Sequence, residues 1–208
     1  MSIVRPASGA AVTVALAAAL LAVAAAATAG DLPAGRVLFN TCLGCHGVPG
    51  YTNVYPSYHV PKLGGQHADY LAAALKEYRS GQRAHPTMTA NASGLDEAQS
   101  AEVAAWLSKL PPSPGQPAAK GDAAAGKEKV TKLGCVACHG ADGNSAAGTF
   151  PKLAGQHADY LVKALEDYHS GARKNPMMAP MAQNLTAQDR LDLAAWFSSQ
   201  PQGLSVVK

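Results

Sequence analysis

The chain contains one long segment twice. Residues 61–106 match residues 151–196 at a constant offset of 90, with 23 identical residues among 46 and no gap. The run GQHADYL occurs in both copies. A repeat of this length and register indicates a duplicated domain. The 208 residues are therefore expected to form two small domains rather than one.

A proline-rich segment separates the two copies. The sequence LPPSPGQPAAKG, residues 110–121, holds four prolines and predicts an extended, semi-rigid linker. The predicted limits are residues 30–110 for the first domain, 111–121 for the linker and 122–208 for the second domain.

The first 29 residues are typical of a secretory signal peptide. Arg5 precedes an apolar run over residues 10–27, and Ala27 and Ala29 provide the small residues of a cleavage site after Ala29. The alternative is an uncleaved membrane anchor. The run consists mainly of alanine, which is only weakly hydrophobic, so the sequence favours cleavage and export.

The pattern within each copy is helical. Aromatic and apolar residues fall on one face of a helix in both copies, at Tyr70, Leu71, Ala74, Leu75 and Tyr78 and at Tyr160, Leu161, Ala164, Leu165 and Tyr168. Gly81 and Gly171 are expected to end these helices. Capping boxes predict a final helix in each copy, through Asp96 with Gln99 and Thr186 with Asp189. Shorter helices are expected around residues 35–40 and 126–132. No segment shows sustained strand alternation, so the predicted fold class is all-α.

Every cysteine of the chain lies in a CxxCH motif. The motifs consist of Cys42, Cys45 and His46 in the first domain and of Cys135, Cys138 and His139 in the second. At this spacing two thiols can attach to the two vinyl groups of one haem, and the next histidine becomes an axial ligand of its iron. The two motifs predict two covalently bound haem c groups, one in each domain.

Two other uses of a CxxC pair explain less of the sequence. A redox disulfide has no need of the following histidine and is expected in a βαβ context. A zinc site would leave unexplained why a histidine directly follows the second cysteine twice. Domains of about 80 residues also bury little apolar area and usually need a covalent or metal staple. A haem in the core would provide one.

The repeat also predicts the second axial ligand of each iron. Met88 is the single methionine of the first domain after the signal peptide, and its mate at offset 90 is Met178. This register distinguishes Met178 from Met177 and Met181. A methionine can instead fill a gap in a core. The shared position relative to the haem motif favours Met88 and Met178 as iron ligands.

Histidine is the competing sixth ligand. His67 and His157 are duplicated, but each stands at a helix start, where capping or surface hydrogen bonding is the expected role. His59 and His85 occur only in the first copy, and His85, three residues before Met88, is the stronger alternative. Open coordination would support ligand binding or peroxide chemistry. No nucleophile with a neighbouring base is apparent in the sequence to support it.

The charged residues argue against a nucleic-acid-binding protein. The 17 Lys and Arg residues are dispersed, and the few aromatic residues are not interleaved with them. Lys129, Lys132 and Lys152 could form a docking rim on the second domain, although a solvated surface is the simpler interpretation.

These motifs resemble the dihaem cytochrome c4 family within the class I cytochromes c. The resemblance covers nearly the whole mature chain and rests on the CxxCH motifs, the segments VPKLGGQ (60–66) and FPKLAGQ (150–156), and a methionine before each final helix. It implies His46 and His139 as proximal ligands, Met88 and Met178 as distal ligands, and the carbonyl groups of Pro61 and Pro151 as acceptors of the proximal imidazole N–H.

The resemblance implies a periplasmic, monomeric electron carrier that is not an enzyme. Its redox partners would be a quinol-oxidising complex and a terminal oxidase, with peripheral membrane association in some members. Two other functions remain open, a haem enzyme or sensor with one reactive or bis-histidine haem and the cytochrome subunit of a periplasmic dehydrogenase. The first domain departs from the second in its loop 48–60 (VPGYTNVYPSYHV), and in Thr87 and Asn91 where the second has Met177 and Met181. These changes bear on the environment of the first haem and so on its potential.

Overall fold

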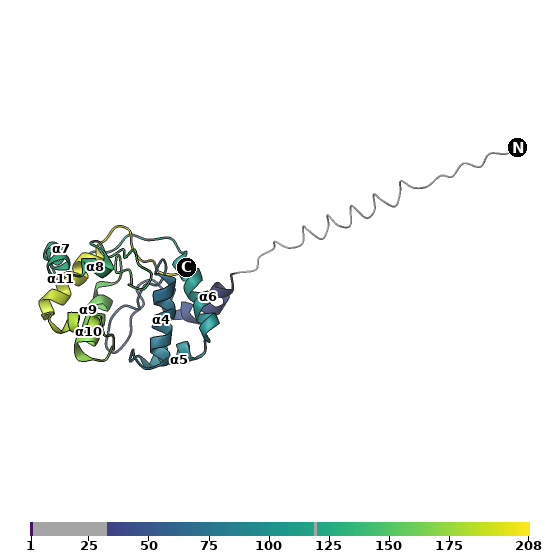
Figure 1. The fold of residues 1–208 in the computed structure, drawn as a ribbon, viewed down its shortest axis with the longest axis horizontal. Coiled ribbons are helices and arrows are strands. Elements are labelled where there is room, and N and C mark those ends of the chain that lie inside the picture. Colours follow the sequence, from purple (N-terminus) through teal and green to yellow (C-terminus); the bar gives the residue numbers. More distant parts are fainter. Residues whose placement is uncertain (2–32, 119) are drawn as a thin grey trace. The chain divides into compact units, whose positions relative to one another are not determined.

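The structure is a computed structural model that describes residue 1, residues 33–118 and residues 120–208. The fold described below is that of residues 34–208 (Figure 1). Apart from residue 1, the expected signal peptide, residues 1–29, lies outside the described residues. In the described part of the chain, no helix combines the length and the apolar character needed to cross a membrane.

Among its described residues, the first domain contains one short 3₁₀ helix and five α-helices. In chain order they are α2 (Ala34–Leu38), η1 (Phe39–Cys42), α3 (Leu43–His46), α4 (Ala68–Arg79), α5 (Pro86–Ser93) and α6 (Glu97–Ser108). Helix α6 packs against both α2 and α4. Phe39, Leu71, Val103 and Leu107 are buried between them and form the centre of the first core.

The second domain repeats this order. Its helices are α7 (Ala123–Lys132), α8 (Val136–His139), α9 (Ala158–Ser170), α10 (Met178–Gln183) and α11 (Ala187–Ser198). Helix α11 packs against α7 and α9, as α6 packs against α2 and α4. Val130, Leu161, Leu193 and Phe197 are buried in the second core. All the named elements among the described residues are helices, which confirms the all-α fold class.

The helices follow the sequence pattern closely. The two long amphipathic segments form α4 and α9, and both predicted capping boxes are present at the start of α6 and α11. Gly171 caps α9 with a φ of 81°, a left-handed conformation that favours glycine. The short helix expected around residues 35–40 is divided between α2 and η1, whereas α7 starts three residues before the expected position.

Glycine allows the first and last helices of each domain to pack closely. A Cβ atom added to Gly35 of α2 would lie 2.1 Å from the carbonyl oxygen of Glu102 in α6. A Cβ atom on Gly126 of α7 would lie 2.1 Å from the carbonyl oxygen of Asp192 in α11. Both contacts are far too short for carbon and oxygen, so each helix crossing requires glycine at this position.

The C-terminal residues pack against the first domain. Val207 is fully buried in the core formed by Phe39 and Leu71, and Ser205 pairs with Gly64 through two backbone hydrogen bonds of 2.9 Å. The proline-rich segment also contacts this tail, since Ser113 and Gly203 exchange backbone hydrogen bonds of 2.9 and 3.0 Å. The C-terminal residues therefore pack in the first core and also bind the linker. The exact domain limits stay a prediction.

Replacing Val207 with alanine is expected to lower the free energy of unfolding by about 2 kcal/mol, because a fully buried side chain loses two methyl groups and leaves a cavity. The matched control is Val206→Ala, since the neighbouring Val206 is only half-buried. Denaturant unfolding followed by far-ultraviolet circular dichroism measures both. Equal losses in the two variants would contradict the burial of Val207 in the first core.

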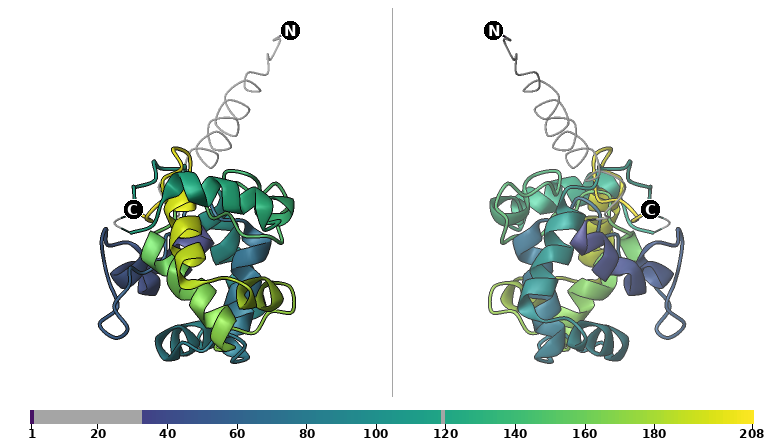
Figure 2. Two further views of the ribbon diagram at one scale, coloured as in Figure 1. Left: turned by 90° about the vertical axis from the view of Figure 1, so that its left-hand side faces the viewer. Right: turned by 90° about the vertical axis from the view of Figure 1, so that its right-hand side faces the viewer.

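The loop of residues 48–60 extends from the first domain (Figure 2). Its two arms are joined by an isolated bridge between Thr52 and His59, and Val54 and Tyr55 at its tip are 95% and 96% exposed. The returning arm ends on the second domain, where the ring centroid of Tyr58 lies 6.3 Å from that of Tyr160. The extra residues of the first domain thus form part of the contact between the domains.

A charged network joins α7 to α11 in the second domain. Lys129 Nζ lies 2.8 Å from Asp189 Oδ1 and 2.5 Å from Asp192 Oδ2. The hydrogen bond from Lys129 is the largest cause that lowers the pKa of Asp189 to about 2. Because this pKa lies below the ordinary 3.8, the network stabilises the folded protein above pH 3.8 and loses this contribution as the pH falls towards 2.

The variant Lys129→Met is expected to flatten the pH dependence of stability between pH 3.8 and about 2, because Asp189 then titrates closer to its unfolded value. Thermal unfolding of the holoprotein across this range measures the effect. Lys132→Met is the control, since Lys132 is an exposed cation at the end of the same helix. The assignment fails if both variants keep the pH dependence of the unmodified protein.

Candidate haem sites

The first CxxCH motif occupies the end of η1 and all of α3. Cys42 and Cys45 are free thiols that are partly buried, and His46 is buried with 9% of its surface exposed. The Nδ1 atom of His46 lies 3.0 Å from the carbonyl oxygen of Pro61. A carbonyl oxygen can only accept, so Nδ1 donates its hydrogen and the Nε2 atom keeps its lone pair.

The second motif has the same geometry. Cys135 and Cys138 are free thiols, and His139, at the end of α8, is 6% exposed. Its Nδ1 atom lies 3.0 Å from the carbonyl oxygen of Pro151. Two imidazole rings, 93 residues apart, are thus held in one tautomer by the same type of backbone contact.

Burial keeps both histidines in the form that a metal requires. Desolvation is the largest cause that lowers the pKa of His46 and of His139 below the ordinary 6.5. Desolvation also raises the pKa of the Cys42 and Cys135 thiols. Each site therefore offers a neutral imidazole with a free Nε2 atom beside a pair of thiols. These donors fit a covalently attached haem.

The backbone N–H groups of the two methionines bind side chains at equivalent positions of the repeat, although Met88 is the third residue of α5 and Met178 is the first residue of α10. His85 is the N-cap of α5, where its Nδ1 atom accepts a hydrogen bond of 3.2 Å from the backbone N–H of Met88. Asn175 Oδ1 accepts the corresponding bond of 3.0 Å from the N–H of Met178. Met88 and Met178 are both half-buried. The register of the repeat thus corresponds to a shared local structure around both methionines.

The hydrogen bond between Met88 and His85 argues against His85 as the alternative iron ligand of the first domain. Because Nδ1 of His85 accepts a hydrogen bond, its Nε2 atom carries the hydrogen and has no lone pair for iron. His85 instead accepts a hydrogen bond from Met88 as Asn175 does from Met178 in the second copy. The helices that carry the methionines were not predicted from the sequence. For α5 the sequence did hold a signal, because Pro86 is favoured in the first turn of a helix and His85 before it can cap that turn.

The duplicated histidines lie between the domains. His67 Nε2 is 2.8 Å from the carbonyl oxygen of Ser145, and the ring of His157 stacks on His59 with centroids 4.7 Å apart. His59 in turn lies 2.7 Å from a carboxylate oxygen of Asp159. The expected role was capping or surface hydrogen bonding. Neither His67 nor His157 caps its helix through its side chain, and the hydrogen bond of His67 is made to the other domain. Their hydrogen bonding and stacking join the two halves of the chain.

Residues of the repeated GQ segments form a set of hydrogen bonds across this interface, which sequence reasoning missed. The amide of Gln156 exchanges hydrogen bonds of 2.9 and 3.0 Å with the backbone of Lys62. The amide of Gln66 makes the equivalent pair with Lys152, both at 2.9 Å. Lys62 Nζ also donates to Gly155, and Lys152 Nζ donates to Gly65. The identity of these segments in both copies was the available signal.

These contacts also bear on the predicted docking rim. Lys152 donates to a backbone carbonyl group of the other domain, and Lys129 pairs with two aspartates of its own domain. Of the three lysines, only Lys132 is exposed, whereas Lys129 and Lys152 are half-buried. Separately, the described residues contain no group of three or more His, Cys, Asp or Glu side chains arranged to hold a metal ion.

Comparison with known proteins decides the family. Residues 33–111 and residues 123–201 each match the family model of cytochrome c. The chain belongs to the cytochrome c family. It consists of two tandem cytochrome c domains of the dihaem c4 type and carries two haem c groups. Both matched segments contain one CxxCH motif and one of the two equivalent methionines.

Three relatives illustrate the similarity. Cytochrome c-552 of Acidithiobacillus ferridurans is 36% identical over 197 residues, which cover 87% of this chain and 84% of that protein. The solved structure of cytochrome c4 from Acidithiobacillus ferrooxidans is 35% identical, with a TM-score of 0.66, and the match covers 77% of this cytochrome c and 99% of that chain. A thiosulfate dehydrogenase electron acceptor of Thiomonas intermedia is 32% identical over 174 residues, covering 77% and 79%. The chain is thus a c4-type electron-transfer protein.

Proposed function

We propose that this cytochrome c holds each haem between a histidine and a methionine. Cys42 and Cys45 would form the thioether bonds of the first haem, with His46 and Met88 as axial ligands. Cys135 and Cys138 would attach the second haem, with His139 and Met178 as axial ligands. The observation that supports this most directly is that each buried imidazole donates from Nδ1 to a proline carbonyl group, at 3.0 Å in both domains.

The bound haem supplies iron that changes between the ferric and ferrous states by one electron. The residues of this chain would hold both states in one geometry. Pro61 and Pro151 fix the tautomer and the plane of each imidazole ring. The buried apolar residues of the two cores exclude water, which favours the ferrous state because it carries less positive charge. Electron transfer is rapid when the iron keeps the same ligands in both states, because few atoms then have to move.

We further propose that the carrier works in the periplasm, between a quinol-oxidising complex and a terminal oxidase. The similarity to c4-type cytochromes and the predicted signal peptide, residues 1–29, support this assignment. In the test, a purified quinol–cytochrome c oxidoreductase should reduce the ferric protein and a purified cytochrome c oxidase should reoxidise it, both in catalytic cycles. The proposal predicts Gly30 as the first residue of the protein recovered from the periplasm. Turnover with neither enzyme would contradict this position in a respiratory chain.

A second candidate function is supported by one group of relatives. The electron acceptor of thiosulfate dehydrogenase from Thiomonas intermedia matches this chain across both domains, not across one. The specific alternative is that this protein accepts electrons from such a dehydrogenase. Mixing the ferric protein with thiosulfate and a purified thiosulfate dehydrogenase would reduce both haems within seconds if this alternative holds. Reduction no faster than the uncatalysed reaction would exclude that donor.

We retain residues 30–110 and 122–208 as the two proposed haem domains and residues 111–121 as the linker. The two separate hydrophobic cores and the two family matches support a boundary in this region. The C-terminal tail crosses that boundary: it belongs to the second domain in sequence, but its Val207 packs in the first core. Peripheral association with the membrane and a monomeric state remain part of the proposal.

A further inference from the structure

The loop of residues 48–60 carries a group of exposed apolar side chains. Among the described residues, eight large apolar side chains are exposed, and four of them lie in this loop: Val48, Tyr51, Val54 and Tyr55. Val54 and Tyr55, which form the loop tip, are 95% and 96% exposed. A single exposed apolar side chain is ordinary on a protein surface, whereas a group of neighbours marks an interaction site. The loop tip is therefore a candidate contact surface.

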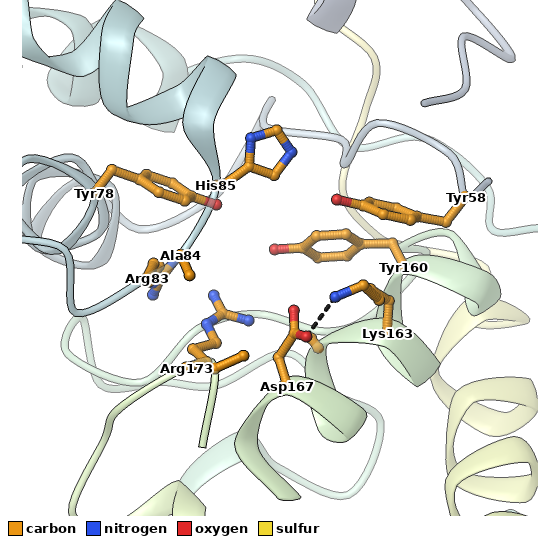
Figure 3. A pocket seen from close by; sticks show the side chains of 11 residues that line it. Tyr58, Tyr78, Arg83, Ala84, His85, Tyr160, Lys163, Asp167 and Arg173 are labelled. Atoms are coloured by element: carbon orange, nitrogen blue, oxygen red, sulfur yellow. Dashed lines mark hydrogen bonds and ion pairs between the residues drawn. The ribbon is translucent and has the colours of Figure 1, made fainter. Parts of the chain in front are cut away.

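The loop is held in one shape from both sides. Behind the tip, the backbone N–H of Asn53 donates to the carbonyl group of Tyr58 at 2.9 Å. The returning arm is attached to the second domain, because the backbone N–H of His59 donates to Asp159 Oδ2 at 3.0 Å. Figure 3 shows the ring of Tyr58 beside that of Tyr160, with 6.3 Å between their centroids. A loop that is ordered in advance loses little conformational entropy when a partner binds it.

The second domain forms its haem site without such a tip. Its equivalent segment, residues 141–150 (ADGNSAAGTF), is three residues shorter. The aromatic residue of this segment, Phe150, is half-buried, and the exposed residues are alanine, aspartate and threonine. The helices that follow have the same order in both domains, and both motif histidines bind a proline carbonyl group at 3.0 Å. Neither the fold nor the haem site therefore requires Val54 and Tyr55.

Both arms of the loop join residues of the first haem site. The outgoing arm starts at Val48, two residues after His46. The returning arm ends at Val60, directly before Pro61, whose carbonyl group accepts a hydrogen bond of 3.0 Å from His46 Nδ1. The loop is thus joined by covalent bonds to the proposed proximal ligand and to the residue that orients it. Contact at the tip brings a partner to the part of the first domain that carries this histidine.

The chemistry of the loop favours a protein as the partner. Residues 47–58 contain no Lys, Arg, Asp or Glu. Segments that bind anionic membranes carry basic residues, and one valine with one tyrosine would bury little area in a bilayer. Tyr, Asn, Ser and Gly, which recur in this loop, are typical of rigid protein-binding loops that insert into a concave surface. A symmetric dimer needs a self-complementary patch, which a convex tip does not provide. An apolar, uncharged hollow on another protein matches the tip in both shape and charge.

We propose that the loop tip docks this cytochrome onto a redox partner protein, by inserting into an apolar, uncharged hollow on that protein. The inference rests on the proposed function as an electron carrier and adds where a partner binds. Tyr55 supplies a large ring with few rotatable bonds, a residue type enriched at the energetic centres of protein interfaces. Val54 adds apolar area beside it. Because neither side chain is charged, the tip stabilises the complex and does not steer the encounter from a distance.

The test compares the wild-type holoprotein with a double variant, Val54→Ser with Tyr55→Ser. Each is assayed in steady-state turnover with purified quinol–cytochrome c oxidoreductase, cytochrome c oxidase and thiosulfate dehydrogenase. With at least one enzyme, the KM for the double variant should rise about tenfold while kcat is retained. The rise should be the same at low and at high ionic strength, because the tip is uncharged.

Two further variants separate the tip from other effects. Tyr55→Phe should keep most of the wild-type KM, because it retains the ring. Val37→Ser is the matched control, since Val37 is 56% exposed but lies in α2, outside the loop. Its KM should be that of the wild type. Both midpoint potentials and the iron–methionine band of the double variant should also be unchanged, because the altered side chains are almost fully exposed.

An unchanged KM with every enzyme that turns over the wild type would overturn the proposal. If the double variant then no longer bound vesicles of phosphatidylethanolamine and phosphatidylglycerol, the tip would be a bilayer contact. If instead a dimer seen by sedimentation velocity were lost, the tip would bind a second copy of this chain. An equal rise in Val37→Ser, or a rise accompanied by altered potentials, would also overturn it. Turnover of the wild type with none of the three enzymes would contradict the proposed function itself, and with it docking to these partners.

Discussion

Replacing Met178 with alanine is expected to remove the ferric iron–methionine charge-transfer band from one haem and to leave it on the other. About half of the band should therefore persist. The affected haem should also lose a sizeable part of the ~0.8 V range of potential that axial ligands span, because a thioether ligand favours ferrous iron. Optical spectra of the oxidised protein and a redox titration measure both effects.

The neighbouring methionines provide matched controls. Met177 and Met181 are 59% and 41% exposed, whereas Met178 is half-buried and its backbone N–H is capped by Asn175. Met177→Ala and Met181→Ala should keep the complete band and both potentials. Loss of half the band in either control, with the band intact in Met178→Ala, would show that the repeat register identified the wrong methionine.

Replacing Gly126 with alanine is expected to lower the free energy of unfolding by about 3 kcal/mol. The new methyl group would lie 2.1 Å from the carbonyl oxygen of Asp192 and 2.9 Å from Cβ of Trp196, so α7 and α11 would have to separate. The neighbouring atoms are backbone or close to it and cannot move aside by a change of rotamer. Denaturant unfolding followed by far-ultraviolet circular dichroism gives the loss.

The control for this substitution is Gly94→Ala at the end of α5. Gly94 has an ordinary φ of −79°, and a Cβ atom there would lie 3.5 Å from its nearest neighbour, the carbonyl oxygen of Asn91. Its stability should change by no more than about 0.5 kcal/mol. Helix propensity favours alanine over glycine, so it cannot account for a loss in either variant. Similar losses in both variants, or no loss in Gly126→Ala, would contradict the close crossing of α7 and α11 at Gly126.

The parts of the fold that depend on local pattern could be predicted from the sequence. Helices α4 and α9 followed from the spacing of their apolar residues, and α6 and α11 from their capping boxes. Helices α5 and α10 were missed because they are short and lack a strong apolar face. The burial of Val207 in the first core could not be predicted, because it depends on where a tail without periodicity comes to lie.

The contacts between the domains were the least predictable feature. GQHADYL repeats in both copies, and an exact repeat is equally consistent with a role inside each domain or between domains. In the structure, Gln66 and Gln156 bind the backbone of the opposite domain. In the same way, no local pattern of the extra loop indicates the contact of Tyr58 with Tyr160.

The most direct test of the central claim is an optical redox titration of the purified mature holoprotein. The ferric iron–methionine band is followed together with the haem bands. Two one-electron steps at high potential, each losing an equal share of that band on reduction, are the predicted result. A haem that is high-spin, or that has a much lower potential and no such band, would contradict histidine–methionine ligation at that site. It would favour ligand binding or peroxide chemistry there instead.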